Sequence, residues 1–89
     1  MSMQFVKMVQ FTRLVKAAGR LREFNFRKVR GTDEDLFSVN VCNERGDRII
    51  FNMQKKENDW KIVPGQAPPW ILQNENALDE EIKDELRNW

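Results

Sequence analysis

Two runs of alternating apolar and polar residues, separated by a short turn, constrain the fold of this chain most strongly. The first run covers residues 37–42 and the second covers residues 49–53. Between them, residues 43–47 are rich in turn formers, and Gly46 can adopt the positive φ that a tight turn needs. A period of two places successive side chains on opposite faces of a strand. The sequence therefore predicts an antiparallel hairpin with one apolar face.

The same alternation predicts a strand on each side of this hairpin. Phe24 and Phe26 alternate with polar residues before the hairpin, and Trp60 and Ile62 alternate with Lys61 after it. Turn-forming segments separate these runs from the hairpin. We therefore predict four strands, at residues 21–30, 36–43, 48–54 and 59–63.

Near the amino end, apolar side chains recur at helical spacing. Counted at about 100° per residue, they fall within one broad arc, whose members are Phe5, Met8, Val9, Phe11, Thr12, Val15 and Ala18. This stripe predicts a helix over residues 3–18, with Ser2 as its N-cap and Gly19 at its end. Loose alternation in the same segment leaves a second interpretation open, a strand over residues 3–11 followed by a short helix.

The carboxyl end has a second stripe of helical period, formed by Ile71, Leu78, Ile82, Leu86 and Trp89. Residues 64–69 precede it and contain three prolines, which cannot continue a sheet. We predict a crossing loop there and a helix over residues 76–88, with Asn76 as a candidate N-cap. The spacing leaves open a longer helix that begins near Pro69, since proline suits the first helical turn. Acidic residues early in this helix and Arg87 late in it suit the helix dipole.

The length of 89 residues allows one hydrophobic core and not two. The predicted fold class is α+β, a single domain over residues 1–89. It is a four-stranded antiparallel β-meander with an N-terminal and a C-terminal helix, in the order α-β-β-β-β-α. No stretch approaches the roughly 18 apolar residues of a transmembrane helix. The only cysteine is Cys42, and the amino end does not resemble a secretory signal. We therefore expect a cytoplasmic protein that does not insert into a membrane.

The residue types present argue against an enzyme. The chain has no histidine, which is the commonest general base near neutral pH and the commonest metal ligand. Cys42 has no cysteine partner for a metal site, and the four glycines are too far apart to form a phosphate loop. Asp33 and Asp35 lie in a predicted solvated loop, where carboxyl groups lack the burial that acid–base catalysis needs. We expect no catalytic, metal-binding or cofactor-binding residues.

Non-catalytic binding is the remaining class of function, and one candidate surface is the sheet face opposite the apolar side chains. Asparagine is disfavoured in strands, yet alternation places several polar uncharged residues on that face. The candidate binding residues of the sheet face are Asn25, Arg27, Ser38, Asn40 and Asn52. The plainer interpretation is that this face contacts only solvent.

Charge is distributed unevenly along the chain. Residues 1–31 have a formal charge of +7 and residues 32–89 one of −6. A basic segment of this kind is a candidate surface for nucleic acid, and its candidate basic patch is Arg13, Lys16, Arg20, Arg22, Arg27 and Lys28. The alternative is that the basic segment and the acidic C-terminal helix neutralise each other within the fold.

Two tryptophans are candidate anchors for a protein partner or for a second copy of the chain. Trp70 follows two prolines, and Trp89 ends the sequence; tryptophan is enriched at the centres of protein interfaces. The interpretation that the sequence favours is a non-catalytic binding or protein-interaction domain, either homodimeric or bound to another protein. The second interpretation is nucleic-acid binding through the basic segment from Arg13 to Arg30.

Overall fold

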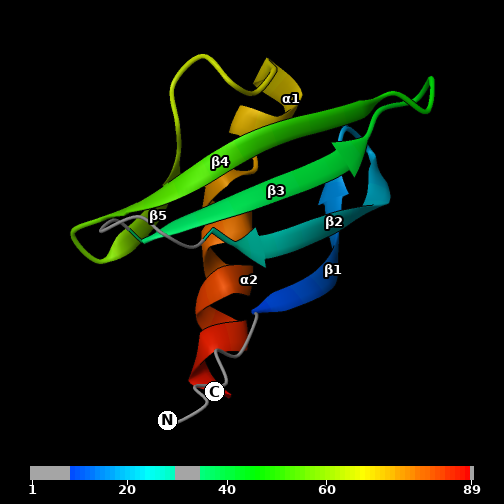
Figure 1. Ribbon diagram of the computed structural model, residues 1–89. Coiled ribbons are helices and arrows are strands. Elements are labelled where there is room, and N and C mark those ends of the chain that lie inside the picture. The colour runs from blue at the N-terminus through cyan, green and yellow to red at the C-terminus, as the bar shows by residue number, and fades with distance from the viewer. Residues whose placement is uncertain (1–8, 30–34, 89) are drawn as a thin grey trace, which may run out of the picture.

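Five antiparallel strands form one curled sheet, and two helices follow it (Figure 1). The computed structural model describes residues 9–29 and 35–88. Its elements are β1 (Gln10–Ala17), β2 (Arg20–Lys28), β3 (Leu36–Cys42), β4 (Arg48–Lys56), β5 (Asp59–Ile62), α1 (Pro69–Leu72) and α2 (Glu75–Arg87). Each strand pairs with the next one in sequence, so the sheet is a meander with β1 and β5 at its edges.

A two-residue turn joins β1 to β2, because Ala17 pairs with Arg20 across the two strands. The turn residues Ala18 and Gly19 have φ values of 52° and 82°. Two consecutive positive φ values define a type I′ turn, whose twist matches that of the flanking strands. Gly19 therefore belongs to a hairpin, and its prediction as the end of a helix is wrong.

This turn gives a first testable prediction, with opposite outcomes at neighbouring positions. Ala18→Asn should stabilise the protein by about 0.5–1 kcal/mol, because asparagine tolerates positive φ better than alanine. Gly19→Ala should destabilise it by about 1 kcal/mol, because it adds a Cβ at a left-handed position. Urea denaturation of both variants measures the two changes. Equal midpoints for the two variants would show that φ at the turn does not control stability.

The hydrophobic core lies between the sheet and the helices. α2 lies behind the sheet in Figure 1 and contacts both edge strands, β1 and β5, so the sheet curls around it. The core contains large side chains from β2 to β5 together with Ile71, Leu78 and Ile82 from the helices. Aromatic rings form a chain through it. Phe11 stacks on Phe26 at 4.6 Å between centroids, and Phe37 meets the edges of Phe11 and Trp60 at 5.8 and 4.9 Å.

Side chains of α2 cover the free edge of β5. The carboxylate of Asp79, which is 7% exposed, accepts a hydrogen bond from the backbone N–H of Trp60 at 2.7 Å. Glu75 accepts one from the backbone N–H of Ile62 at 2.8 Å. An edge strand otherwise presents unpaired backbone donors, which invite pairing with another chain. These two carboxylates therefore fix the helix to the sheet and satisfy the edge at the same time.

Lys83 links the same helix to the turn before β5. Its ammonium group lies 2.8 Å from Asp59 and 2.9 Å from Asp79. The hydrogen bond with Asp59 raises the pKa of Lys83, and the same contact lowers the pKa of the Asp59 carboxyl below its usual value. Because the pKa of Asp59 is lower in the folded protein, the stabilisation from this pair is present above pH 4 or so and is lost on acidification.

The structure confirms most of the predicted order of elements and corrects its beginning. The four predicted strands correspond to β2, β3, β4 and β5, and the predicted C-terminal helix corresponds to α2. The helix predicted over residues 3–18 is wrong where it is described, because residues 10–17 form β1; residues 1–8 lie outside the described part. The alternative short helix after residue 11 is wrong for the same reason.

The start of the C-terminal helix also differs from the prediction. Asn76 lies inside α2, so its prediction as the N-cap is wrong; Asn74 occupies the cap position and makes no side-chain capping hydrogen bond. A separate short helix, α1, begins at Pro69 after the proline-rich loop. None of the helices in the described residues has the length and apolar composition required to span a membrane.

Candidate binding face

The convex side of the sheet, away from the helices, contains the candidate residues predicted from strand alternation. Burial alternates along β1 to β4, with core side chains pointing toward α2. We call the opposite side the outer face; its residues are Gln10, Thr12, Leu14, Lys16, Leu21, Glu23, Asn25, Arg27, Leu36, Ser38, Asn40, Cys42, Arg48, Ile50, Asn52 and Gln54. The cross-strand pairs Arg27 with Ser38 and Ser38 with Asn52 bring candidate residues of β2, β3 and β4 side by side.

A row of polar side chains crosses the outer face from β1 to β3. The Thr12 hydroxyl donates a hydrogen bond to Asn25 Oδ1 at 2.7 Å, and Asn25 Nδ2 donates one to Asn40 Oδ1 at 3.1 Å. Each of these residues is directly opposite the next in the strand register. The row uses only part of the hydrogen-bonding capacity of the two amides. It holds them in fixed positions while leaving groups available to a ligand.

Two shallow hollows lie on either side of Asn25. The first, which we call the Arg27 hollow, has a volume of about 270 Å³ and is lined by Thr12, Arg27 and Asn40 among others. The second, the Arg48 hollow, has a volume of about 230 Å³, and its lining includes Arg20 and Arg48. Both volumes are below the roughly 300 Å³ at which pockets begin to enclose a small molecule. The hollows therefore suit surface contacts with a larger partner.

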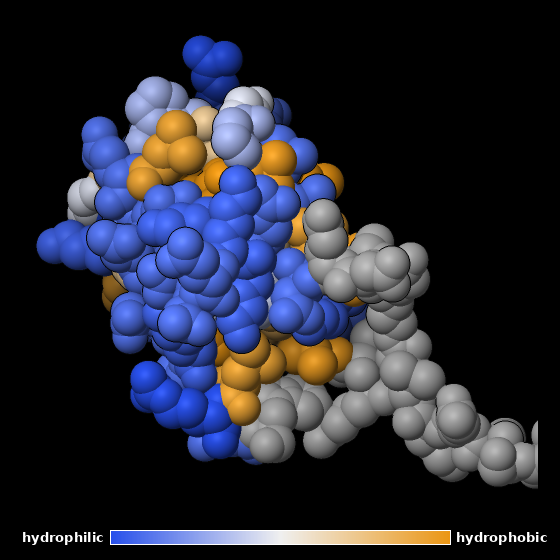
Figure 2. Space-filling view, turned by 90° about the vertical axis from the view of Figure 1, so that its left-hand side faces the viewer, coloured by the Kyte–Doolittle hydropathy of each residue, from blue (hydrophilic) through white to orange (hydrophobic). Residues whose placement is uncertain are grey.

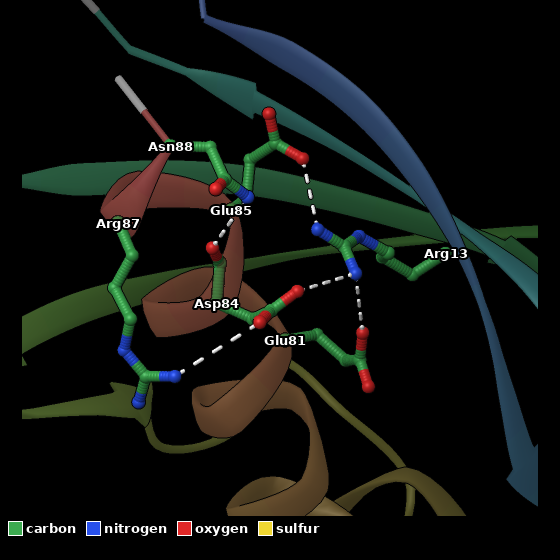
Figure 3. Close-up of polar contacts among 6 residues, drawn as sticks. All are labelled: Arg13, Glu81, Asp84, Glu85, Arg87 and Asn88. Atoms are coloured by element: carbon green, nitrogen blue, oxygen red, sulfur yellow. Dashed lines mark hydrogen bonds and ion pairs between the residues drawn. The ribbon is translucent and has the colours of Figure 1, made fainter.

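Arg13 is part of the predicted basic patch, but its side chain lies between β1 and α2 (Figure 3). Its guanidinium group lies 3.2 Å from Glu81, 2.9 Å from Asp84 and 2.9 Å from Glu85. The hydrogen bonds to Glu85 and then Asp84 raise the pKa of Arg13. This contact joins the basic segment to the acidic helix, so internal neutralisation accounts for Arg13.

The other residues of the predicted basic patch fall into two groups, because some side chains point toward the core and others point into solvent. Arg22 points inward, donates to the carbonyl of Ala17 at 2.8 Å and lies 3.3 Å from Glu44. Lys28 also points inward and lies 3.2 Å from Asp35.

Lys16, Arg20 and Arg27 are exposed, and no ion pair involves them in the part of the chain that the structure describes. Arg48, on the outer face of β4, is also exposed and has no ion pair among these residues. The basic segment is therefore not one continuous patch.

Trp70, a candidate anchor for a protein partner, is half-buried and contacts other parts of the chain. Its ring packs against the core and lies under the guanidinium group of Arg22, with 4.9 Å between the ring centroid and the Arg22 Cζ atom. The two residues also line a hollow of about 160 Å³. Trp89 lies outside the described residues.

Three aliphatic side chains on the outer face were not among the residues predicted to bind. Leu14, Leu21 and Ile50 are 64%, 65% and 63% exposed. Strand alternation places Leu21 and Ile50 on this face from the sequence, whereas Leu14 lies in the segment predicted as a helix and is found only from the structure. On the side of the molecule drawn in Figure 2, hydrophobic areas are small and separated by hydrophilic ones. On the outer face, Leu14 is opposite Glu23 and Ile50 is opposite Asn40, so the exposed aliphatics add local apolar contacts among polar side chains.

Among the described residues, no group of three or more acidic, cysteine or histidine side chains is placed to hold a metal ion. Cys42 is exposed and has a free thiol. The structure defines the class as a small α+β domain with an antiparallel sheet curled around a C-terminal helix. Comparison with protein-family models, with curated proteins and with solved structures gives no match.

Proposed function

We propose that this protein is a non-catalytic binding domain and that the outer face of its sheet is the binding surface. The observation that carries the proposal is the coincidence, on one face, of an ordered amide row, three exposed aliphatic side chains and exposed cations. Among the described residues, Leu14, Leu21 and Ile50 are exposed and lie outside the hydrophobic core. Amides and aliphatics together are the groups that a macromolecular interface combines.

The hollows support a macromolecule over an enclosed substrate. They are open and shared along the face, and Asn25 lines both of them. A catalytic centre requires a water-excluded site with reactive groups converging on one point. The described part of the outer face has instead a spread of hydrogen-bonding groups, which supports binding without chemistry.

Enlarging side chains in the centre of the outer face tests this proposal. Ser38→Gln and Asn40→Gln, made together, add bulk without charge, so they should obstruct a partner of either charge. We expect at least a tenfold reduction in the macromolecules crosslinked to the tagged protein in the cells that produce it.

The matched control is Asn76→Gln with Ala77→Gln, which enlarges two exposed residues of α2. Crosslinked material should be unchanged in that variant. Equal amounts of crosslinked protein and nucleic acid for wild type and both variants would place the binding surface elsewhere on the molecule.

A further inference from the structure

Some cations of the sheet are neutralised by carboxylates of the chain and others are not. The division does not follow the faces strictly: Arg20, opposite Ala17, has no ion pair among the described residues, and Lys61, opposite Gln54, contacts Glu75. On the side facing the helices, Arg13, Arg22 and Lys28 each contact a carboxylate within the chain. On the outer face, Lys16, Arg27 and Arg48 have no ionic partner among residues 9–29 and 35–88. Water can solvate an exposed cation, so such a side chain needs no ionic partner. The outer face nevertheless has a net positive charge, because its described residues include Lys16, Arg27 and Arg48 but only one carboxylate, Glu23. Charge complementarity therefore indicates an anionic partner.

We propose that the outer face binds a single-stranded nucleic acid, with Lys16, Arg27 and Arg48 contacting phosphates and the Asn25 and Asn40 amides contacting base edges. This inference rests on the proposed function, because it names the partner of the same face. It differs from nucleic-acid binding through the whole basic segment from Arg13 to Arg30. Arg13, Arg22 and Lys28 do not contact the nucleic acid in this proposal, because they contact carboxylates of the chain. Arg48, which lies outside that segment, does contact it.

The two hollows resemble each other in chemistry, which supports a ligand built from repeating units. The Arg27 hollow combines one guanidinium with the amides of Asn25 and Asn40. The Arg48 hollow combines guanidinium groups with the same Asn25 and the apolar Leu21, and its lining also includes one carboxylate, that of Glu23. A nucleic-acid strand repeats one anion and one hydrogen-bonding ring per unit. A sheet face of comparable size is sufficient for two or three bases in known RNA-binding folds.

The geometry favours a single strand over a duplex. The major groove of a duplex admits a helix or a two-stranded ribbon, whereas the amide row lies in the middle of a broad sheet. Amides at that position reach base edges only when the bases are unpaired. In the described residues the aromatic rings of β1 to β4 face the core, so base contacts on the outer face involve Leu14, Leu21 and Ile50. We therefore expect modest affinity that depends strongly on salt.

A second copy of the chain fits this face poorly. A two-fold symmetric contact through the same face would place two sets of cations together, with Glu23 the only acidic side chain among the described residues assigned to the outer face. An acidic protein would match the charge of this face, but its carboxylates would not use the hydrogen-bonding amides at the centre. The experiment below distinguishes an acidic protein from a nucleic acid.

Fluorescence anisotropy of the full chain with labelled oligo(dT), oligo(U) and duplex DNA of about 12 units tests the inference. Single strands should bind more tightly than the duplex. Affinity should fall about 20-fold between about 50 and 200 mM salt, because three phosphate contacts give a slope near −2. Arg27→Gln and Arg48→Gln should each weaken binding at low salt and reduce this slope by about 0.7.

Arg87→Gln is the matched control, because it removes the same charge from the exposed end of α2; its affinity and slope should equal those of wild type. Duplex binding as tight as single-strand binding, or no oligonucleotide binding at low salt, would overturn the inference. Binding of polyglutamate without oligonucleotides would also overturn it, while the proposed function would stand. The crosslinking experiment with the Ser38 and Asn40 variant does not use oligonucleotides. A failure of the proposed function can therefore be distinguished from a failure of the nucleic-acid inference.

Discussion

Replacing Phe37 with alanine is expected to destabilise this protein by about 3–5 kcal/mol, the usual cost of removing a buried phenyl ring. Phe37 is fully buried, and its ring meets those of Phe11 from β1 and Trp60 from β5. It therefore links both edge strands through the centre of the core. A domain of this length has a total stability of about 4–13 kcal/mol, so this single change should remove about a quarter of that stability or more.

The control for Phe37→Ala is Leu21→Ala, which shortens an apolar side chain on the outer face. Leu21 is 65% exposed, so this change should alter stability by no more than about 0.5 kcal/mol. Urea denaturation followed by tryptophan fluorescence measures both variants. A loss below about 1 kcal/mol for Phe37→Ala would mean that the core rearranges to fill the space.

The strands after residue 20 were predictable because their alternation is produced by short-range sequence. In β3, Phe37, Val39 and Val41 are apolar and buried; in β4, Phe51 and Met53 are buried and Ile49 is partly buried; and turn formers separate the runs. The position of the outer-face residues follows from the same alternation. Strand pairing was equally simple to predict, since each strand joins its neighbour in sequence.

The first strand was missed because its alternation is interrupted by charge. Phe11, Arg13, Val15 and Ala17 all point toward the core side in β1, and Arg13 breaks the apolar series. Its partners Glu81 and Glu85 are 68 and 72 residues away in sequence, so no local pattern reveals that this arginine is satisfied there. The turn gave little help, because Ala18 and Gly19 are not the Asn-Gly pair that marks a type I′ hairpin.

The sequence was sufficient to predict where the candidate site lies, but not which of its cations are neutralised by other side chains. Alternation placed Asn25, Asn40 and Asn52 on one face, and the register confirms that they share it. Which cations are neutralised depends on tertiary contacts, because alternation separates the inward Arg22 from the outward Arg27 but does not show which acidic side chain reaches either. Only folding pairs the first with Glu44 and leaves the second exposed.

Replacing Asp79 with alanine should destabilise the protein by about 1–3 kcal/mol, because it leaves a buried backbone donor without an acceptor. Asp79 accepts the Trp60 N–H at 2.7 Å and contacts Lys83 at 2.9 Å. Lys83 retains Asp59 as a partner, so the main loss is the hydrogen bond to the edge of β5. The amide of Trp60 should therefore exchange with solvent deuterium faster than the amides of β3, by a factor of about ten or more.

Two further variants separate the hydrogen bond from the charge and from the helix itself. Asp79→Asn keeps an oxygen that accepts from Trp60, so protection of that amide should stay near the wild-type level even though the contact with Lys83 weakens. Glu80→Ala removes an exposed carboxylate from the adjacent position of α2 and should change neither stability nor exchange. If the Trp60 amide stays equally protected in Asp79→Ala, water or a repositioned strand has replaced the carboxylate, and α2 is fixed to β5 mainly by Leu78 and Ile82 in the core.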